Sequence, residues 1–317
     1  MRGVFLDLGT VSNGDLDIAS LRRALPDLEF HEQTGPAELA ARIAAHEAVL
    51  LNKCRITRET MAANPQLRLI ALTATGTDNV DLGAARERGI AVANLHDYCT
   101  PSVVQHVFAV VLALTHRLRE YDTLVRRGDW SRSGQFSVFP YPIRELADRK
   151  LGIVGHGALG SAVARVGEAF GMQVVVANRP GGARAPGRRD LHDLLPDIDV
   201  LTLHCPLTPV TRGLIGAHEL GLMKPDAVLV NTARGALVDA AALAVALRAG
   251  RLGGAGLDVL DQEPPEPGHP LLDPGIPNLI LTPHVAWAAR ESRQRCLDEL
   301  ALNVVAFLRG ERRNRVD

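Results

Sequence analysis

Short apolar runs alternate with amphipathic segments along nearly the whole chain. In the first third, the apolar runs 3–8, 47–52 and 67–75 are each followed by a segment whose apolar residues have helical spacing. Such runs are typical of strands buried on both faces, which occur in parallel sheets covered by helices. The pattern therefore predicts an α/β fold built on parallel sheets.

A change of pattern near residue 100 predicts a domain boundary. Thr100 or Ser102 can cap a helix whose apolar face is almost continuous from 103 to 118. After a polar connector, a second alternating series supplies six apolar runs: 150–157, 173–178, 199–206, 227–233, 253–260 and 278–285. The last helix carries Leu297, Leu300 and Val304 at helical spacing and is expected to pack on the first domain. We predict two doubly wound parallel-sheet domains, one made of 1–98 and 286–317 and the other of 99–285.

The first apolar run of the second series leads into a glycine motif. Gly155, Gly157 and Gly160 form G-x-G-x-x-G between a predicted strand and a predicted helix that begins near Ala158 and Leu159. The glycines permit a tight turn and close approach of the backbone to a pyrophosphate, and the helix N-terminus offers N–H groups to the anion. This order of elements predicts a dinucleotide site of the Rossmann type.

The next strand ends in Asn178-Arg179, where an acid usually accepts hydrogen bonds from the adenosine ribose. Asn178 removes the repulsion that an acid exerts on a 2′-phosphate. Arg179, with Arg184 and Arg188 on the following loop, can bind that phosphate. We therefore expect NAD(P) with a preference for NADP(H). The alternative is that Asn178 binds the ribose of NAD and that the arginines are solvated.

Three later runs are each followed by a charged or titratable residue, where ligands bind in open α/β sheets. The segments are NTARGALVD with Arg234, GLDVLDQEPP with Asp258 and Glu263, and TPHVAW with His284. Together with ATGTDNVDL and GHGALG, in this order, the chain resembles the D-isomer-specific 2-hydroxyacid dehydrogenase family over essentially its whole length. The resemblance implies a flavodoxin-like substrate domain beside the Rossmann domain.

The resemblance also implies three catalytic roles. Arg234 would hold the carboxylate and carbonyl oxygen of a 2-oxo acid, since a guanidinium matches that geometry. His284 would give a proton to the carbonyl oxygen as hydride arrives and remove one in the reverse direction. Glu263 would bind the other ring nitrogen, fix the tautomer and favour the imidazolium form.

Further positions follow from the same resemblance. Those expected to contact substrate are Lys53, Thr75, Gly76 and Trp287. Those expected to line the cofactor, besides the glycine turn, are Cys205, Pro206, Ala233 and Asp258, with Asp258 accepting from the nicotinamide carboxamide.

The segments DYCTPSVVQHVFA and TPHVAWAARE are most similar to the glycerate dehydrogenase and hydroxypyruvate (glyoxylate) reductase branch. Trp287 would narrow the cleft, which favours hydroxypyruvate or glyoxylate. The alternatives are a family member acting on another 2-hydroxy acid, of lactate or phosphoglycerate type, and a nucleotide-sensing scaffold similar to the family's co-repressor branch.

Composition restricts the partners. The net charge is −1 with dispersed basic residues, and no run of 18 apolar residues occurs, so neither nucleic acid nor membrane is an expected partner. The four cysteines fit neither a zinc pattern nor a disulfide framework, so a cytoplasmic protein without structural metal is expected. The aromatic-rich connector from Tyr121 to Lys150 is our candidate for a homodimer contact.

Overall fold

The computed structural model describes residues 1–317, which divide into two compact units. Unit 1 consists of Met1–Cys99 and Trp287–Asp317, and unit 2 of Thr100–Ala286. The boundaries expected from the sequence lie one residue before these.

Unit 1 contains a five-stranded parallel sheet in the order β2-β1-β3-β4-β5, the order of flavodoxin-like doubly wound folds. Its strands are β1 (Gly3–Phe5), β2 (Leu28–Phe30), β3 (Ala48–Leu51), β4 (Leu69–Leu72) and β5 (Ala91–Ala93). Its helices are α1 (Ala19–Ala24), α2 (Pro36–Ile43), α3 (Arg58–Ala62), α4 (Leu82–Glu87), α12 (Arg290–Leu308) and the 3₁₀ turn η1 (Leu8–Thr10).

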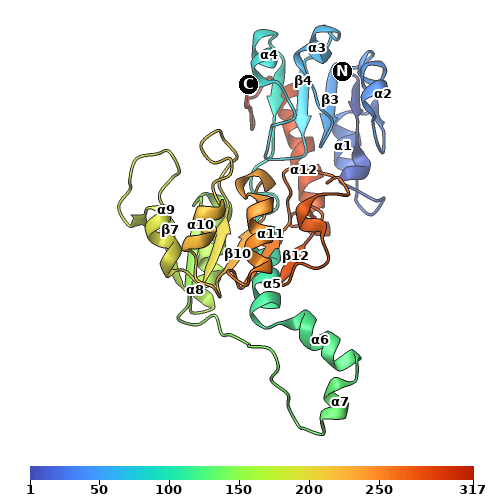
Figure 1. Ribbon diagram of the computed structural model, residues 1–317. Helices are drawn as coiled ribbons and strands as arrows, with labels where there is room; N and C mark the ends of the chain where they lie inside the picture. The colour runs from blue at the N-terminus through green and yellow to red at the C-terminus, as the bar shows by residue number, and fades with distance from the viewer. The chain divides into compact units, whose positions relative to one another are not determined.

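The core of unit 1 lies on both faces of its sheet, as expected for a parallel sheet with few polar positions. Phe5 and Leu50 face one cluster, whereas the neighbouring Val4 and Val49 face the other. The first cluster includes Leu297, Leu300 and Val304 of α12, all fully buried. The C-terminal helix therefore packs on the first domain as predicted, and Figure 1 shows it behind β4.

Unit 2 contains a seven-stranded parallel sheet in the order β12-β11-β10-β9-β6-β7-β8. Its strands are β6 (Lys150–Val154), β7 (Gln173–Ala177), β8 (Arg188–Arg189), β9 (Val200–Leu203), β10 (Val228–Asn231), β11 (Gly254–Leu257) and β12 (Leu279–Leu281). Its helices are α5 (Thr100–Thr115), α6 (Leu118–Arg126), α7 (Asp129–Ser133), α8 (Ala158–Ala169), α9 (Leu191–Leu194), α10 (Ala217–Leu222) and α11 (Ala240–Arg248), with the 3₁₀ turns η2 (Leu195–Asp197), η3 (Gly235–Leu237) and η4 (Pro270–Leu272).

The strand order of unit 2 is that of a Rossmann fold with one added edge strand, β12. The order reverses between β6 and β9, so a ligand crevice is expected beside the carboxyl ends of these two strands. The sequence predicted six strands and missed β8. Its two residues are arginines, which carry no apolar pattern.

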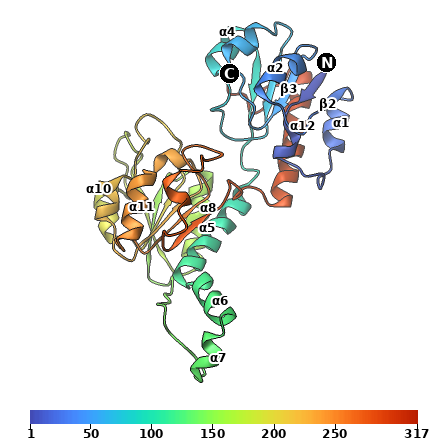
Figure 2. The ribbon, with the colours of Figure 1, turned by 45° about the vertical axis from the view of Figure 1, so that its right-hand side comes forward.

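The connector between α5 and β6 is more regular than its composition suggested. It contains α6 and α7, which continue beyond the end of α5 in both views before the chain returns to β6 (Figures 1 and 2). Helix α6 is amphipathic, but of its side chains only Leu124 is buried within the chain.

None of the helices combines the length and the apolar character that a membrane span requires. All four cysteines are unpaired thiols, and burial raises the pKa of Cys54 to about 12 and that of Cys99 to about 11.

Candidate active site

Glu263 and His284 form a direct pair. Nδ1 of His284 lies 2.6 Å from Oε2 of Glu263. Because a carboxylate oxygen accepts, the imidazole donates its Nδ1 hydrogen, and Nε2 becomes the ring nitrogen that can exchange a proton with a ligand. The other carboxylate oxygen accepts from the Leu260 main-chain N–H at 3.0 Å, which fixes the carboxylate. The side chain of His284 is 26% exposed and that of Glu263 is 35% exposed, so a small molecule can reach them.

Asp258 holds the segment that carries His284. Its buried carboxylate accepts from the main-chain N–H groups of Val285 and Ala286, both at 2.8 Å, and from the Thr282 hydroxyl at 2.5 Å. The Asp258 carbonyl accepts from the His284 N–H at 2.8 Å. His284 has a φ of +57°, an uncommon left-handed conformation for a residue other than glycine. These hydrogen bonds stabilise that conformation.

The Asp258 carboxylate therefore has a main-chain positioning role that the sequence did not suggest. His106 of α5 extends the network, since its Nε2 lies 3.1 Å from the Thr282 hydroxyl. No sequence signal connects His106 with residue 282. Acceptance from a nicotinamide carboxamide by Asp258 stays a prediction.

Arg234 follows β10 in a loop fixed by the buried side chain of Asn231. The Asn231 amide donates to the Arg234 carbonyl at 2.8 Å and accepts from the Ala233 N–H at 3.0 Å. The Arg234 guanidinium donates to the Ala233 carbonyl at 2.8 Å. Asn231, the last residue of β10, thus fixes the main chain from which the Arg234 guanidinium extends.

Gly235 brings the Arg234 loop against the segment that leads to Glu263. A Cβ atom at Gly235 would lie 1.9 Å from the carbonyl carbon of Leu260, so no larger residue fits there. Strands β10, β11 and β12 are parallel neighbours, and their following segments carry Arg234, Glu263 and His284 respectively. The three predicted catalytic residues therefore belong to one edge of one sheet.

The glycine turn has the close contacts that the motif predicts. Gly155 has a φ of +96°, and a Cβ there would lie 2.5 Å from the Cys205 main-chain nitrogen. A Cβ at Gly160 would lie 2.0 Å from the Gly155 carbonyl oxygen. Only glycine satisfies both positions.

Gly157 is the N-cap of α8 and supplies no side-chain cap to the N–H groups of its first turn, at Ala158 and Leu159. A Cβ built at Gly157 meets no atom within 4 Å, so the turn has open space on that side. Uncapped N–H groups facing open space at the start of a twelve-residue helix suit a phosphate group.

The ends of β9 and β10 contain buried polar atoms without a hydrogen bond. These are Oγ1 of Thr232, beside Ala233, and Nδ1 of His204, beside Cys205. Burial lowers the pKa of His204 to about 4, and its Nε2 lies 2.9 Å from the Thr202 hydroxyl. Cys205 is buried, Ala233 is half-buried and Pro206 is exposed. Polar atoms of this kind at the sheet edge fit a nucleotide cofactor.

Asn178 has a different environment from the one the sequence suggested. Its amide donates to Asp190 Oδ1 at 2.7 Å and accepts from the Ala185 N–H at 3.0 Å. Arg184 is paired with the same carboxylate of Asp190. Asn178 therefore organises the loop between β7 and β8, whereas Arg179 is exposed. The sequence missed Asp190, an acid that is distant along the chain but adjacent to Asn178 through the β7–β8 pairing.

Unit 1 carries the remaining substrate candidates at the ends of adjacent strands. The exposed Lys53 follows β3, and Thr75 and Gly76 follow β4. The buried Asp7 carboxylate accepts from the main-chain N–H groups of Asn52, Lys53 and Cys54, at 2.8, 2.6 and 3.0 Å. The sequence analysis did not single out Asp7, whose position at the end of β1 was the available signal.

Trp287 begins the second segment of unit 1. Its ring contacts Tyr98 edge-on, with centroids 6.3 Å apart, and packs on the core cluster that contains α12. Narrowing of a substrate cleft by this ring stays a prediction.

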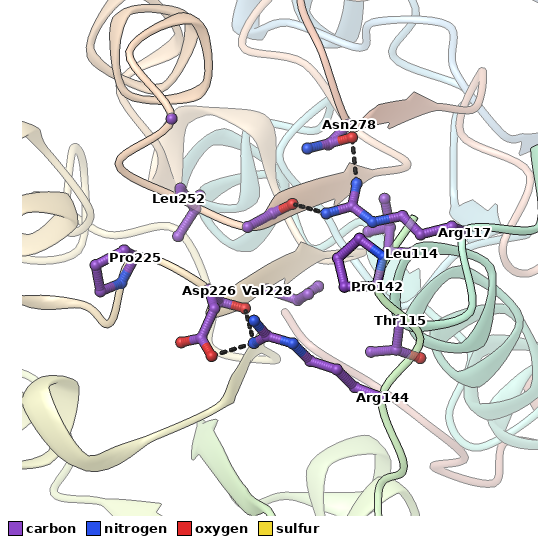
Figure 3. Close-up of a pocket in the computed structure, with 12 residues that line it drawn as sticks. Leu114, Thr115, Arg117, Pro142, Arg144, Pro225, Asp226, Val228, Leu252 and Asn278 are labelled. Atoms are coloured by element: carbon purple, nitrogen blue, oxygen red, sulfur yellow. Dashed lines mark hydrogen bonds and ion pairs between the residues drawn. The ribbon is translucent and has the colours of Figure 1, made fainter. Parts of the chain in front are cut away.

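A cavity of about 210 Å³ lies at the opposite edge of the unit 2 sheet from Arg234 and His284 (Figure 3). Its lining includes Val228, which starts β10, and Gly253 and Asn278, which precede β11 and β12. Arg117 binds Asn278 there, and Arg144 binds Asp226. These contacts fix both ends of the connector that contains α6 and α7.

The model of a protein family described as "D-isomer specific 2-hydroxyacid dehydrogenase, NAD binding domain" matches residues 108–286. A glycerate dehydrogenase from Methylorubrum extorquens is 46% identical over 91% of each chain. A hydroxypyruvate reductase from Blautia hydrogenotrophica is 34% identical over 98% of each chain. A glyoxylate reductase from Aeropyrum pernix is 41% identical over 81% of this chain and 78% of its own.

Solved structures agree over the full length. A Thermus thermophilus protein has a TM-score of 0.88 and 38% identity, with complete coverage of both chains. An acyclic imino acid reductase in complex with NADPH and D-Arg has a TM-score of 0.87 and 28% identity, also with complete coverage. A D-lactate dehydrogenase from Aquifex aeolicus, complexed with NAD and lactic acid, has a TM-score of 0.84 and 28% identity over 98% of this chain and 96% of its own.

Proposed function

Because the chain belongs to the D-isomer-specific 2-hydroxyacid dehydrogenase family, we propose that it interconverts a small 2-oxo acid and its 2-hydroxy acid, with hydroxypyruvate or glyoxylate as the 2-oxo acid. The single observation that carries this proposal is the 2.6 Å contact between His284 and Glu263 on the sheet edge that also carries Arg234. The relatives that act on glycerate, hydroxypyruvate and glyoxylate by name support the choice of substrate.

In this proposal each side chain performs one task. A bound nicotinamide cofactor supplies the hydride for reduction and accepts it for oxidation. The Arg234 guanidinium binds the substrate carboxylate and the carbonyl oxygen, which orients and polarises the carbonyl. His284 delivers the proton on Nε2 to that oxygen, and Glu263 stabilises the resulting ring tautomer and the imidazolium that donates.

Residues of unit 2 would hold the cofactor. The uncapped N–H groups at the start of α8 suit the pyrophosphate, and the Thr232 hydroxyl supplies a neighbouring polar group. Ala233, Cys205 and Pro206 would line the cofactor beside it. The chain therefore binds a nicotinamide dinucleotide, in agreement with the family's domain description.

We propose NADP(H) as the preferred cofactor. Both ends of the Asn178 amide are engaged within the loop, so the preference depends on the exposed Arg179, on Arg184 of the loop and on Arg188 at the start of β8. Asp190 is the only acid paired with Asn178, and its charge is offset by Arg184. A 2′-phosphate therefore meets an arginine-rich loop rather than an unpaired acid.

Unit 1 would bind the substrate's carboxylate. The main chain at Thr75 and Gly76 and the ammonium group of Lys53 follow neighbouring strands, and Asn79 ties their loops together by donating to the carbonyls of Asn52 and Cys54. Trp287 would limit the size of the substrate.

The connector that contains α6 and α7 is our candidate for homodimer formation. Its exposed apolar side chains include Trp130, Phe136 and Phe139, of which Phe136 is 95% and Phe139 is 83% exposed. Apolar surface of this extent is typical of an interface between subunits. Light scattering at micromolar concentration is expected to give the mass of a dimer, and a monomer would contradict the assignment.

We expect a cytoplasmic location, which the four unpaired thiols support. The experiment that tests the function is a panel of 2-oxo acids, including hydroxypyruvate, glyoxylate, pyruvate and 3-phosphohydroxypyruvate, each with NADH and NADPH. Highest kcat/KM on hydroxypyruvate or glyoxylate is expected. Turnover at background rate for every acid would contradict the proposal and favour a nucleotide-sensing scaffold.

A further inference from the structure

We propose that His192, His218 and Glu219 form a binding site for a late first-row divalent metal ion such as Zn²⁺. None of these residues belongs to the proposed catalytic or cofactor-binding set. The inference does not depend on the enzymatic reaction, so either proposal can fail without the other.

The fold brings the three side chains together from two helices of unit 2. His192 lies in α9, and His218 and Glu219 lie in the first turn of α10. One ligand atom from each residue lies within 4.8 Å of the other two. His192 Nε2 is 3.0 Å from Glu219 Oε1, and the two imidazole rings meet edge to face with centroids 5.4 Å apart.

This donor set has the chemistry of a zinc site. Two imidazole nitrogens and one carboxylate oxygen are ligands that Zn²⁺ uses when it keeps a fourth position for water. In a tetrahedral site with bonds near 2.0–2.1 Å, neighbouring ligand atoms lie roughly 3.4 Å apart. The longest separation must therefore close by less than about 1.5 Å, which rotation of exposed imidazoles can supply.

Glu219 is already oriented for the role. Its Oε2 accepts from the N–H of Gly216, the N-cap residue of α10, at 3.0 Å, and Oε1 points toward His192. The Glu219 side chain is 17% exposed, whereas that of His192 is 61% exposed. Glu219 is thus held by the backbone, while an ion can reach the three side chains from solvent on the side of His192.

The His218 side chain forms no hydrogen bond that binding of an ion would break. Its imidazole is exposed and makes no hydrogen bond or ion pair in the structure, and its one ring contact is with His192. Its imidazole can therefore turn toward an ion without breaking another side-chain hydrogen bond. A bound ion would link α9 to α10 and stabilise the folded state by mass action.

The test is isothermal titration of chelator-treated protein, carrying no polyhistidine tag, with ZnCl₂ and separately with MgCl₂. We expect one equivalent of Zn²⁺ with a dissociation constant on the order of 10 µM or tighter and no heat of binding for Mg²⁺, which prefers oxygen ligands. Zn²⁺ is also expected to raise the Tm of the wild type.

Two variants and one control make the result specific. His218→Ala is expected to weaken Zn²⁺ binding at least about tenfold with an unchanged Tm in the absence of metal, since a ligand is lost and no hydrogen bond is. Glu219→Gln keeps an oxygen acceptor for Gly216 but loses the charge, so it should bind less tightly and remain folded. His96→Ala removes an exposed histidine of unit 1 and should bind like the wild type.

Two results would overturn the site. One is the absence of Zn²⁺ binding to the wild type below about 1 mM. The other is binding that His218→Ala and Glu219→Gln leave unchanged, which would locate the ion elsewhere on the chain.

Discussion

The Nδ1 atom of His284 lies 2.6 Å from Oε2 of Glu263, although the two residues are 21 positions apart and follow different strands. This contact fixes which ring nitrogen bears the exchangeable proton.

Replacement of Glu263 by glutamine tests the importance of its charge. Glu263→Gln is expected to lower kcat about 10- to 100-fold, because the imidazolium loses its carboxylate partner, with little change in the KM of the cofactor. Steady-state kinetics with hydroxypyruvate measure both. Glu266→Gln, in the same exposed segment, is the matched control and should keep its activity. An equal kcat for Glu263→Gln and wild type would mean that the pair is not catalytic.

One variant of Asp258 distinguishes two roles of its carboxylate: holding the segment that carries His284, and binding the cofactor. Asp258→Asn replaces one of two accepting oxygens by an amide that faces N–H or O–H donors, at a cost of about 1–3 kcal/mol in the free energy of unfolding. If the carboxylate mainly positions the His284 segment, Tm and kcat fall together while the KM of the cofactor changes little. A selective rise in that KM, with Tm unchanged, would instead favour the carboxamide role.

His204, whose Nδ1 atom is buried, should make unit 2 sensitive to acid. Its pKa is about 4 in the folded protein against 6.5 as the ordinary value, so the unfolded chain binds a proton first as the pH falls. Its effect on stability is small above pH 6.5, and stability is lost progressively between pH 6.5 and pH 4. From pH 7 to pH 5 the loss attributable to His204 is about 2 kcal/mol.

Urea unfolding of wild type and His204→Gln at pH 7 and pH 5 measures that loss. The free energy of unfolding of each protein at pH 5 is compared with its own value at pH 7. A destabilisation by the substitution that is the same at both pH values therefore cancels. The decrease in the free energy of unfolding should be smaller in the variant by about 2 kcal/mol. Equal decreases would show that His204 takes up its proton over the same pH range in the folded protein as in the unfolded chain.

Arg179 is the residue on which the cofactor preference is expected to depend. Arg179→Ala should raise the KM of NADPH at least about tenfold, the scale of a lost charged hydrogen bond, and leave the KM of NADH nearly unchanged. Arg312→Ala, an exposed arginine of unit 1, controls for net charge. Parallel increases for both cofactors would remove Arg179 from the 2′ position. Asn178→Asp is a less selective test, because it would set two carboxylates against each other at the Asp190 contact.

The sequence predicted those features that depend on local pattern. Buried strands have continuous apolar runs, and the glycine turn has a fixed spacing, so both sheets and the turn at Gly155 could be located. The spacing of Leu297, Leu300 and Val304 placed α12 correctly on the first domain. Helices α6 and α7 were missed because they are short and mostly polar, although α6 is amphipathic.

The features that it missed depend on contacts between distant residues. Asp190 meets Asn178 only because β8 pairs with β7, and His106 meets Thr282 across 176 positions. The metal expectation was based on the cysteines, whereas His192 and His218 are separated along the chain and are joined only by the packing of α9 and α10. No spacing rule connects such pairs before the strand order is known.

The roles of His284 and Arg234 are tested most sharply by the kcat of His284→Ala and Arg234→Ala for hydroxypyruvate reduction, with both proteins verified as folded by their Tm. We expect His284→Ala to lower kcat by roughly 100-fold or more, as for a lost general acid, and Arg234→Ala to impair kcat and KM together. Near-normal turnover in either variant would mean that the chemistry takes place outside the strand ends that carry these two residues.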